Sequence, residues 1–199
     1  MNVATSITIT RILLIPVFVY FAIAYSVSGA EDAELRFWAL AVFGIAALSD
    51  ALDGWVARHF NQSTAMGRFL DPVADKLLVL SAILTLSFAQ WNTSLPIWFG
   101  VLVISRDLLI VFGVLYIRSK VGKVEMGPLI SSKICTFLQL SCVCWVLLDF
   151  WTVDGRHVVL EILVWLAAVF TLLSGWRYLS EGIRQLRAFN TTTPPTDVP

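Results

Sequence analysis

The sequence predicts an all-α, polytopic membrane protein with six transmembrane helices. Of its 199 residues, 58% are hydrophobic and only 14% are charged, and the mean hydropathy is +0.80. Soluble domains are less apolar and carry more charge. The apolar residues also fall into long runs, each near the roughly 20 residues that cross a bilayer as a helix. The formal net charge of zero gives no basis for nucleic-acid binding.

Six apolar segments follow one another, and we expect each to cross the membrane once. They cover residues 7–27, 35–52, 71–90, 95–117, 129–150 and 157–179. Together they predict one transmembrane domain, residues 1–189, and a disordered Thr- and Pro-rich tail at 190–199. The first segment, followed by Ser28-Gly29-Ala30, is also similar to a secretory signal peptide, but it is long enough to span a bilayer.

Basic residues are shared unevenly between the two ends of these segments. The loops near 28–36, 91–95 and 151–156 hold only Arg36 and Arg156, whereas the opposite ends carry most of the other lysines and arginines. Because cytoplasmic loops are enriched in basic residues, we expect both termini on the cytoplasmic side, in a membrane such as a bacterial inner membrane. Four tryptophans at the other ends predict an outer aromatic belt. They are Trp38, Trp91, Trp98 and Trp151.

Four carboxylates stand at the facing ends of the second and third segments. Asp50 and Asp53 are three residues apart, and Asp71 and Asp75 are four apart. On helices, both spacings put the two side chains on one face. Two antiparallel helices joined by residues 59–70 can therefore aim all four carboxylates at one point.

The energetic cost of these carboxylates points to bound cations. An ionised carboxylate inside a membrane segment costs about 2.5–3.5 kcal/mol, and nearby basic residues are too few to neutralise four. Hard divalent cations prefer oxygen ligands, so we expect the aspartates to hold two Mg²⁺ or Mn²⁺ ions. The alternative is that the four acids are solvated at the ends of the helices.

The acidic stretch resembles the signature of the CDP-alcohol phosphatidyltransferases, D-x2-D-G-x2-A-R-x8-G-x3-D-x3-D. All of its fixed positions match at the right spacing. They are Asp50, Asp53, Gly54, Ala57, Arg58, Gly67, Asp71 and Asp75. Thr10-Arg11 followed by Pro16 extends the resemblance into the first segment. The resemblance implies six membrane helices, a homodimer, and transfer of a phosphatidyl group from CDP-diacylglycerol to an alcohol with release of CMP.

The same resemblance implies a role for each residue of the signature. The four aspartates would bind the metal ions, and Asp75 would also be the catalytic general base on the acceptor hydroxyl. The remaining residues would bind CDP-diacylglycerol. Gly54 and Ala57 would leave room for the cytidine, Arg58 would contact the nucleotide phosphates, and Gly67 would allow close approach.

A second group of charged and polar residues, in the fourth and fifth segments, is a candidate for recognising the acceptor alcohol. Arg106-Asp107 precedes Arg118, and the run Ser132-Lys133-x-x-Thr136-x-x-Gln139 follows. This pattern is similar to that of the eukaryotic-type cardiolipin synthase branch. The sister branch, phosphatidylglycerophosphate synthase, typically carries R-E in place of Arg106-Asp107, with a further L-R in the fourth helix.

The charge of the acceptor also favours the cardiolipin synthase branch. Glycerol-3-phosphate carries a dianionic phosphomonoester and should need several cations to bind it, whereas phosphatidylglycerol carries one negative charge. We therefore predict that the protein joins CDP-diacylglycerol to phosphatidylglycerol, giving cardiolipin and CMP. The predicted acceptor residues are Arg106, Arg118, Ser132 and Lys133. The alternative acceptor is glycerol-3-phosphate, giving phosphatidylglycerophosphate. Arg106 and Asp107 can also form a purely structural ion pair.

Carboxylates in membrane helices also occur in divalent-cation transporters, which form a more remote alternative. A transport site normally lies near the bilayer midplane on discontinuous helices. Here the acids lie at the ends of two segments beside Arg58. That position favours an enzyme that takes a diphosphate substrate from the cytoplasm.

Overall fold

The computed structural model describes residues 3–60, 65–89, 91–121, 130–148 and 156–192, and side chains in 9–49, 74, 76–89, 91–117, 119, 131–148 and 158–185. This part of the chain is all helical. Its helices are α1 (Val3–Val27), α2 (Ala33–Phe60), α3 (Ala65–Phe88), α4 (Ile97–Val121), α5 (Ile130–Leu148) and α6 (Arg156–Thr192). The predicted all-α class and the number of long helices are confirmed for the described residues.

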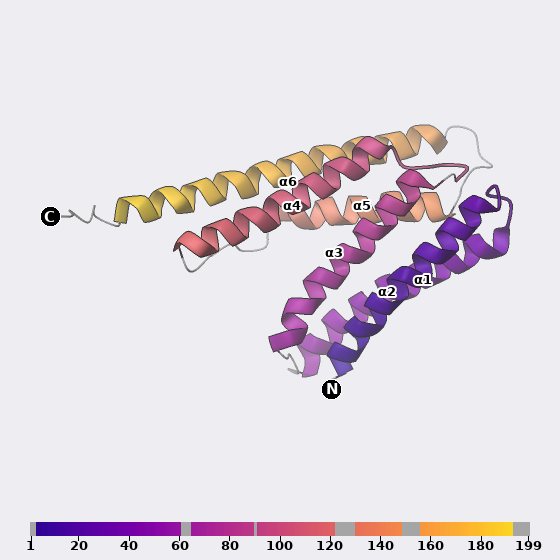
Figure 1. Ribbon diagram of the computed structural model, residues 1–199, viewed down its shortest axis with the longest axis horizontal. Helices are drawn as coiled ribbons and strands as arrows, with labels where there is room; N and C mark the ends of the chain where they lie inside the picture. Colours follow the sequence, from indigo (N-terminus) through magenta and orange to yellow (C-terminus); the bar gives the residue numbers. More distant parts are fainter. Residues whose placement is uncertain (1–2, 61–64, 90, 122–129, 149–155, 193–199) are drawn as a thin grey trace.

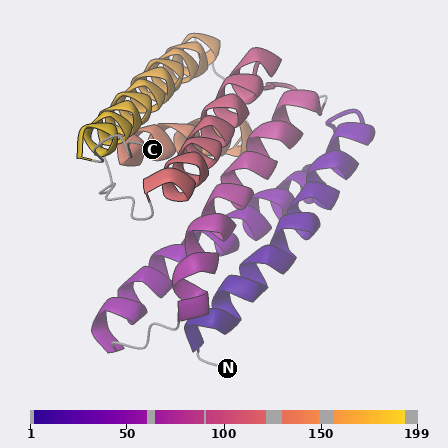
Figure 2. The same cartoon turned by 60° about the vertical axis from the view of Figure 1, so that its left-hand side comes forward.

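The six helices form two arms of three. In the N-terminal arm, α1 packs along both α2 and α3, and in the C-terminal arm α6 packs along both α4 and α5. The arms meet where α3 leads into α4, and they diverge toward the end that holds the N-terminus and the start of α3 (Figure 1). The view in Figure 2 shows α3 of the N-terminal arm and α4 of the C-terminal arm side by side where the two arms meet.

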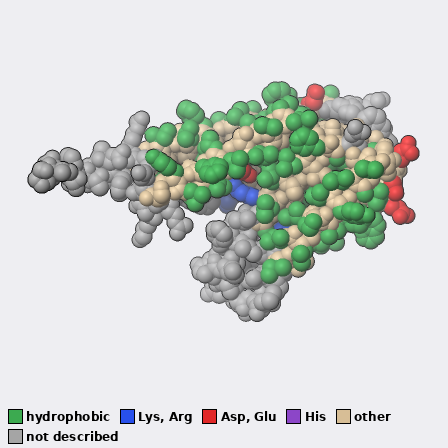
Figure 3. All heavy atoms as spheres, viewed as in Figure 1, with side chains coloured by type: hydrophobic (Ala, Val, Ile, Leu, Met, Phe, Trp, Pro, Cys, Tyr) green, Lys and Arg blue, Asp and Glu red, His purple; other side chains and the backbone are tan. Residues whose placement is uncertain are grey.

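Within the described residues, four helices contain a stretch long and apolar enough to cross a membrane. These stretches are Ile9–Val27, Ile97–Ile117, Ser131–Leu148 and Val158–Gln185. Apolar side chains are spread over much of the described face seen in Figure 3, as expected for a surface that faces lipid. The apolar part of α3 is shorter, at Lys76–Phe88, so membrane crossing by α2 and α3 stays a prediction.

Small residues allow the helices of each arm to approach closely. Ala22 of α1, Ala46 of α2 and Ala82 of α3 are fully buried, as is Ala167 of α6. Without a strong hydrophobic force between helices in lipid, small residues promote association because they bring backbones into van der Waals contact. Larger side chains fill the spaces between them, and the rings of Phe18 and Phe43, 5.5 Å apart, join α1 to α2.

The junction between the arms is built around Trp91, in the connection from α3 to α4. Its indole Nε1 donates to the carbonyl oxygen of Ala22 at 3.2 Å, and its ring lies 4.5 Å from that of Tyr25, edge to face. The Leu95 amide donates to the Leu86 carbonyl at 3.1 Å. Trp91 is thus buried, whereas Trp38 and Trp98 are exposed. Trp151 lies outside the described residues, and the outer aromatic belt stays a prediction.

Several helices are longer than their apolar segments predicted. The second runs to Phe60 rather than residue 52, the third begins at Ala65 rather than 71, and the sixth ends at Thr192 rather than 179. Hydropathy stops at the first charged residues, but backbone hydrogen bonding continues through them. The remainder of the predicted tail, residues 193–199, lies outside the described part. The Ser28-Gly29-Ala30 sequence forms the turn after α1, where Gly29 and Ala30 have left-handed φ angles of 78° and 61°.

Candidate active site

The aspartate signature lies on two helices that α1 holds together. Asp50 and Asp53 are in α2, near its end, and Asp71 and Asp75 are in the first half of α3. The backbone is helical through each pair, which is the condition under which a spacing of three or four residues places both members on one face. Divalent cations require oxygen ligands, and binding of a metal by these aspartates stays a prediction.

The side chains of the signature lie outside the described residues, so the predicted metal and CDP-diacylglycerol contacts stay predictions. This applies to all eight of its residues, which are Asp50, Asp53, Gly54, Ala57, Arg58, Gly67, Asp71 and Asp75. Among the side chains that are described, no group of three or more His, Cys, Asp or Glu is placed to hold a metal ion. Arg11, which extends the signature into α1, is 1% exposed and adds a buried cation to the N-terminal arm.

The predicted acceptor residue Arg106 is the centre of a polar cluster in the C-terminal arm. Its Nη1 donates to Asp107 Oδ1 at 2.6 Å, and its Nη2 donates to Ser132 Oγ of α5 at 3.0 Å. The same Nη2 donates to Ser174 Oγ of α6, and the guanidinium carbon lies 5.9 Å from the ring centre of Tyr178. Three helices therefore fix one guanidinium and bring together Arg106 and Ser132, two of the predicted acceptor residues, whose binding of an acceptor stays a prediction.

A lysine from the other arm joins this cluster. Lys76 Nζ of α3 donates to the same Asp107 Oδ1 at 3.2 Å. One carboxylate is thus shared by two cations, and the trio keeps a net positive charge. Basic side chains are visible in the angle between the two arms (Figure 3). The cluster can therefore attract an anion even though Arg106 and Asp107 are paired.

Two polar atoms of the cluster region are left without a partner. Arg106 Nε and Ser131 Oγ are buried and have no hydrogen-bond partner among the described residues. An unsatisfied buried donor costs about 1–3 kcal/mol, and more when the group is charged. The Nε–H of Arg106 is already removed from water. A ligand oxygen could therefore accept a hydrogen bond from it without further desolvation of the arginine.

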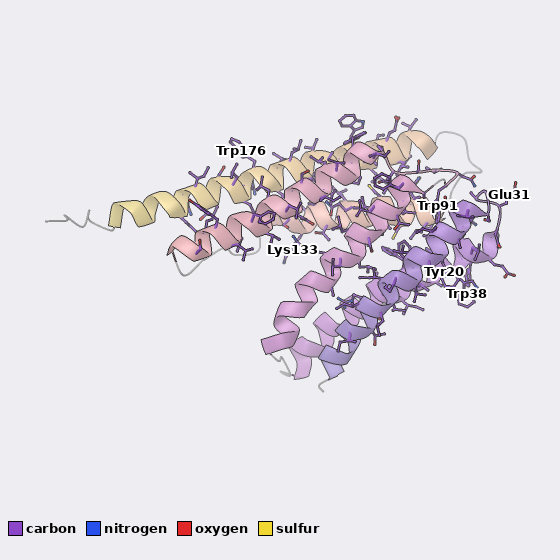
Figure 4. The ribbon with its side chains drawn as sticks, viewed as in Figure 1. Tyr20, Glu31, Trp38, Trp91, Lys133 and Trp176 are labelled. Atoms are coloured by element: carbon purple, nitrogen blue, oxygen red, sulfur yellow. The ribbon has the colours of Figure 1, made fainter. Side chains whose placement is uncertain are left out.

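The other two predicted acceptor residues are Lys133 of α5 and Arg118 of α4. Lys133 is exposed and lies on the edge of the C-terminal arm that faces the angle between the arms (Figure 4). Arg118 is twelve residues after Arg106 in α4, which places its backbone about 18 Å further along the helix. The side chain of Arg118 is outside the described part.

Two residues of α6 were missed when only the sequence was considered. Ser174 and Tyr178 contact Arg106, and neither belongs to a recognised motif. One signal was present, because Thr171, Ser174 and Tyr178 follow one another at helical spacing in an otherwise apolar segment. A polar stripe on one face of a membrane helix normally faces other protein groups rather than lipid.

Comparison with known proteins gives relatives that align over almost the whole chain. The CDP-diacylglycerol–glycerol-3-phosphate 3-phosphatidyltransferase of Bacillus subtilis is 33% identical over 95% of this chain and 99% of its own length. The Escherichia coli K12 protein of the same name is 35% identical over 90% of this chain and 93% of its own length. A probable phosphatidylglycerophosphate synthase of Mycobacterium tuberculosis is 30% identical over 96% of this chain and 86% of its own length.

These relatives overturn the prediction of a cardiolipin synthase, because they are named for glycerol-3-phosphate as the acceptor. The structure supplies the physical reason for the error. The charge argument allowed for an Arg106–Asp107 pair but not for a second cation beside Asp107. Lys76 of α3 contacts the same carboxylate, and sequence spacing did not reveal this contact.

The family is established independently of the acceptor. The match to the CDP-alcohol phosphatidyltransferase family covers residues 1–173, which includes the whole signature and five of the six helices completely. The protein is thus a member of the CDP-alcohol phosphatidyltransferase family.

Proposed function

We propose that this protein transfers the phosphatidyl group of CDP-diacylglycerol to glycerol-3-phosphate, giving phosphatidylglycerophosphate and CMP. The observation that carries the proposal is the near full-length similarity to proteins named for this reaction. The net positive charge of the Lys76–Asp107–Arg106 trio supports it, since a phosphomonoester is attracted more strongly than a phosphodiester by such a cluster.

The donor site in this proposal is the signature on α2 and α3. Asp50, Asp53, Asp71 and Asp75 would hold two Mg²⁺ or Mn²⁺ ions, whose charge would offset that of the diphosphate. Gly54, Ala57 and Gly67 would admit the nucleotide, because none of them has a large side chain. Arg58 would donate hydrogen bonds to the nucleotide phosphates.

The reaction is a single displacement at phosphorus. A hydroxyl oxygen of glycerol-3-phosphate forms a bond to the phosphorus of the phosphatidyl group. The bond from that phosphorus to the oxygen bridging to CMP breaks, and CMP leaves with the electron pair. Asp75 accepts the hydroxyl proton as general base. It follows the other three aspartates in the chain and shares a face of α3 with Asp71.

The acceptor site in this proposal lies across the angle between the arms. Arg106 would donate its unpaired Nε–H to a phosphate oxygen, supported by Ser132, which already orients the guanidinium. Lys133 and Arg118 would add positive charge along the path of the phosphate. Binding an acceptor here would bring it between the aspartate helices and the C-terminal arm.

We further propose that the signature and both termini face the cytoplasm and that the protein is a homodimer. The uneven distribution of basic residues supports the orientation. The dimer is an expectation from the family. Both substrates would then reach the site from the side on which nucleotides and glycerol-3-phosphate are found.

The proposal is tested with the purified protein, CDP-diacylglycerol, Mg²⁺ or Mn²⁺, and one acceptor at a time. We expect glycerol-3-phosphate to give a phosphatidylglycerophosphate band on lipid chromatography together with stoichiometric CMP. Phosphatidylglycerol serves as the control acceptor and should give no product. CMP release that requires some other alcohol, with none from glycerol-3-phosphate, would overturn the proposed acceptor while leaving the family unchanged.

A further inference from the structure

A chain of ionic contacts crosses from one arm of the molecule to the other. Lys76 of α3 and Arg106 of α4 both donate to Asp107 Oδ1, at 3.2 and 2.6 Å. Lys76 directly follows Asp75, the proposed general base. The chain of contacts therefore begins beside the proposed catalytic aspartate and ends on the proposed phosphate-binding arginine.

The two ends of this chain differ in how firmly they are held. The Arg106 side chain is 7% exposed, and Ser132 and Ser174 fix its Nη2. The Lys76 side chain is 46% exposed and the Asp107 side chain 19%. Arg106 and Asp107 thus form a fixed point in the C-terminal arm, and the lysine reaches that point from a helix that belongs to the other arm.

We propose that Asp107 and Lys76 are positioning residues that set the distance between the acceptor phosphate and the base on α3. The inference rests on the proposed function, because it assigns Arg106 to the acceptor. Neither residue needs to contact the substrate. Their ion pair would hold α3 and α4 at the separation at which the acceptor hydroxyl lies within reach of Asp75.

The Lys76–Asp107 ion pair would control the distance between the acceptor hydroxyl and Asp75. A general base has to lie within about 2.6–3.2 Å of the group from which it takes a proton, and a displacement of about 1 Å can lower a rate by about a hundredfold. The arms diverge toward the signature (Figure 1), so a contact beyond their junction limits how far they can separate. The Lys76–Asp107 pair is such a contact.

A double-mutant cycle tests this inference. Lys76→Met and Asp107→Asn each remove one side of the pair and nearly preserve side-chain volume. We expect either variant to lower kcat/KM for glycerol-3-phosphate by about tenfold, and the double variant to be no worse than Asp107→Asn alone, because both changes break one link. The KM for CDP-diacylglycerol should not change. Asp107→Glu keeps the negative charge and should recover most of the activity.

A matched control is available in Glu181, which accepts from Arg184 at 2.8 Å in an ion pair outside the chain of contacts. Glu181→Gln should leave all of these constants unchanged. Effects of Lys76→Met and Asp107→Asn that multiply in the double variant would overturn the inference. A lower KM for glycerol-3-phosphate in Asp107→Asn would also overturn it, because the carboxylate would then be a competitor of the phosphate. Failure of the unmodified protein to use glycerol-3-phosphate would instead overturn the proposed function.

Discussion

Arg106 is the side chain on which the described polar contacts converge. Burying an arginine in a membrane helix costs about 2.5–3.5 kcal/mol, and here the cost is offset by one carboxylate, two hydroxyls and an aromatic face. These partners come from α4, α5 and α6, so the guanidinium also joins the helices of its arm. Its unpaired Nε is consistent with a ligand oxygen as the remaining partner.

Ser174 offers a test of this arrangement, because it orients Arg106 from α6. Ser174→Ala should raise the KM for glycerol-3-phosphate by about tenfold, since hydrogen bonds to charged groups contribute about 1.5–3 kcal/mol, and should leave the KM for CDP-diacylglycerol unchanged. Ser174→Thr keeps the hydroxyl and should restore binding. The control is Ser105→Ala, whose hydroxyl donates to the backbone of its own helix. Equal losses for both substrates would assign Ser174 a purely structural role.

The aspartates can be separated by their tasks. Asp50→Asn, Asp53→Asn or Asp71→Asn should abolish turnover and weaken metal-dependent binding of CDP-diacylglycerol, as should removal of the metal with a chelator. Asp75→Asn should lose most turnover yet retain nucleotide binding, because its distinct task is to accept a proton. Steady-state kinetics and equilibrium binding measure the two effects, with the exposed Glu34→Gln as control.

Two outcomes would contradict these assignments. Activity that survives in any two of the first three variants at saturating metal would exclude the metal site. Nucleotide binding that collapses in Asp75→Asn as severely as in Asp50→Asn would make Asp75 mainly a ligand and place the base elsewhere.

At the scale of helices, the sequence predicted which elements exist better than where they end. Long apolar runs placed α1, α4, α5 and the start of α6 well, because lipid-facing residues leave a clear hydropathy signal. The ends of α2 and α6 and the start of α3 were placed several residues short, since the chain is polar there although helical, as in Asp50–Arg58 and Gly67–Asp75. The sequence predicted those candidate site residues that are neighbours in the chain or belong to a motif. Ser174 and the contact of Lys76 with Asp107 depend on tertiary packing, which spacing does not encode.

The crossing of α3 and α4 depends on a glycine. A Cβ added to Gly100 would lie 3.3 Å from Ser87 Oγ, and both residues are buried. Gly44, in contrast, has no atom within 4 Å of such a Cβ. Both positions gain similar helix propensity from alanine, about 1 kcal/mol, so a comparison of the two isolates the packing effect.

We expect Gly100→Ala to be less stable than Gly44→Ala by about 1–3 kcal/mol, the usual cost of overpacking, as measured by unfolding in detergent micelles. Adding Ser87→Ala to Gly100→Ala removes the hydroxyl and should recover the loss. Equal stability of Gly100→Ala and Gly44→Ala would mean that the helices shift apart without penalty.

For the whole molecule, the predicted orientation in the membrane rests on the distribution of charge. Glu31 lies in the turn between α1 and α2 (Figure 4), at the end predicted to face outward, and Ser119 is exposed near the other end of α4. In a variant whose three native cysteines are replaced, Glu31→Cys should react with a membrane-impermeant maleimide in intact cells. Ser119→Cys should react only after permeabilisation, because basic ends stay in the cytoplasm. The reverse labelling pattern would refute the orientation.

The prediction of the acceptor shows that a short sequence motif can fail to separate the branches of one family. Asp107 in place of glutamate changes neither charge nor hydrogen-bonding capacity, so a motif that differs there carries little physical information. Lys76, whose contact with Asp107 the charge argument left out, lies thirty-one positions earlier in the chain. The names of relatives that align along almost their full length contradict what the short pattern indicated.

Trp91 lies just after the end of α3, so a small rotation of the helix there would move the far end of α3. From Phe88 at the end of α3 to Gly67 near its start, the helix measures about 31 Å. Rotating such a rigid rod by about 2° at one end moves the other by about 1 Å, a displacement that can change a rate by about a hundredfold. We therefore expect substitutions at Tyr25 or Trp91 to lower turnover of the purified protein, although neither residue belongs to the predicted donor or acceptor site.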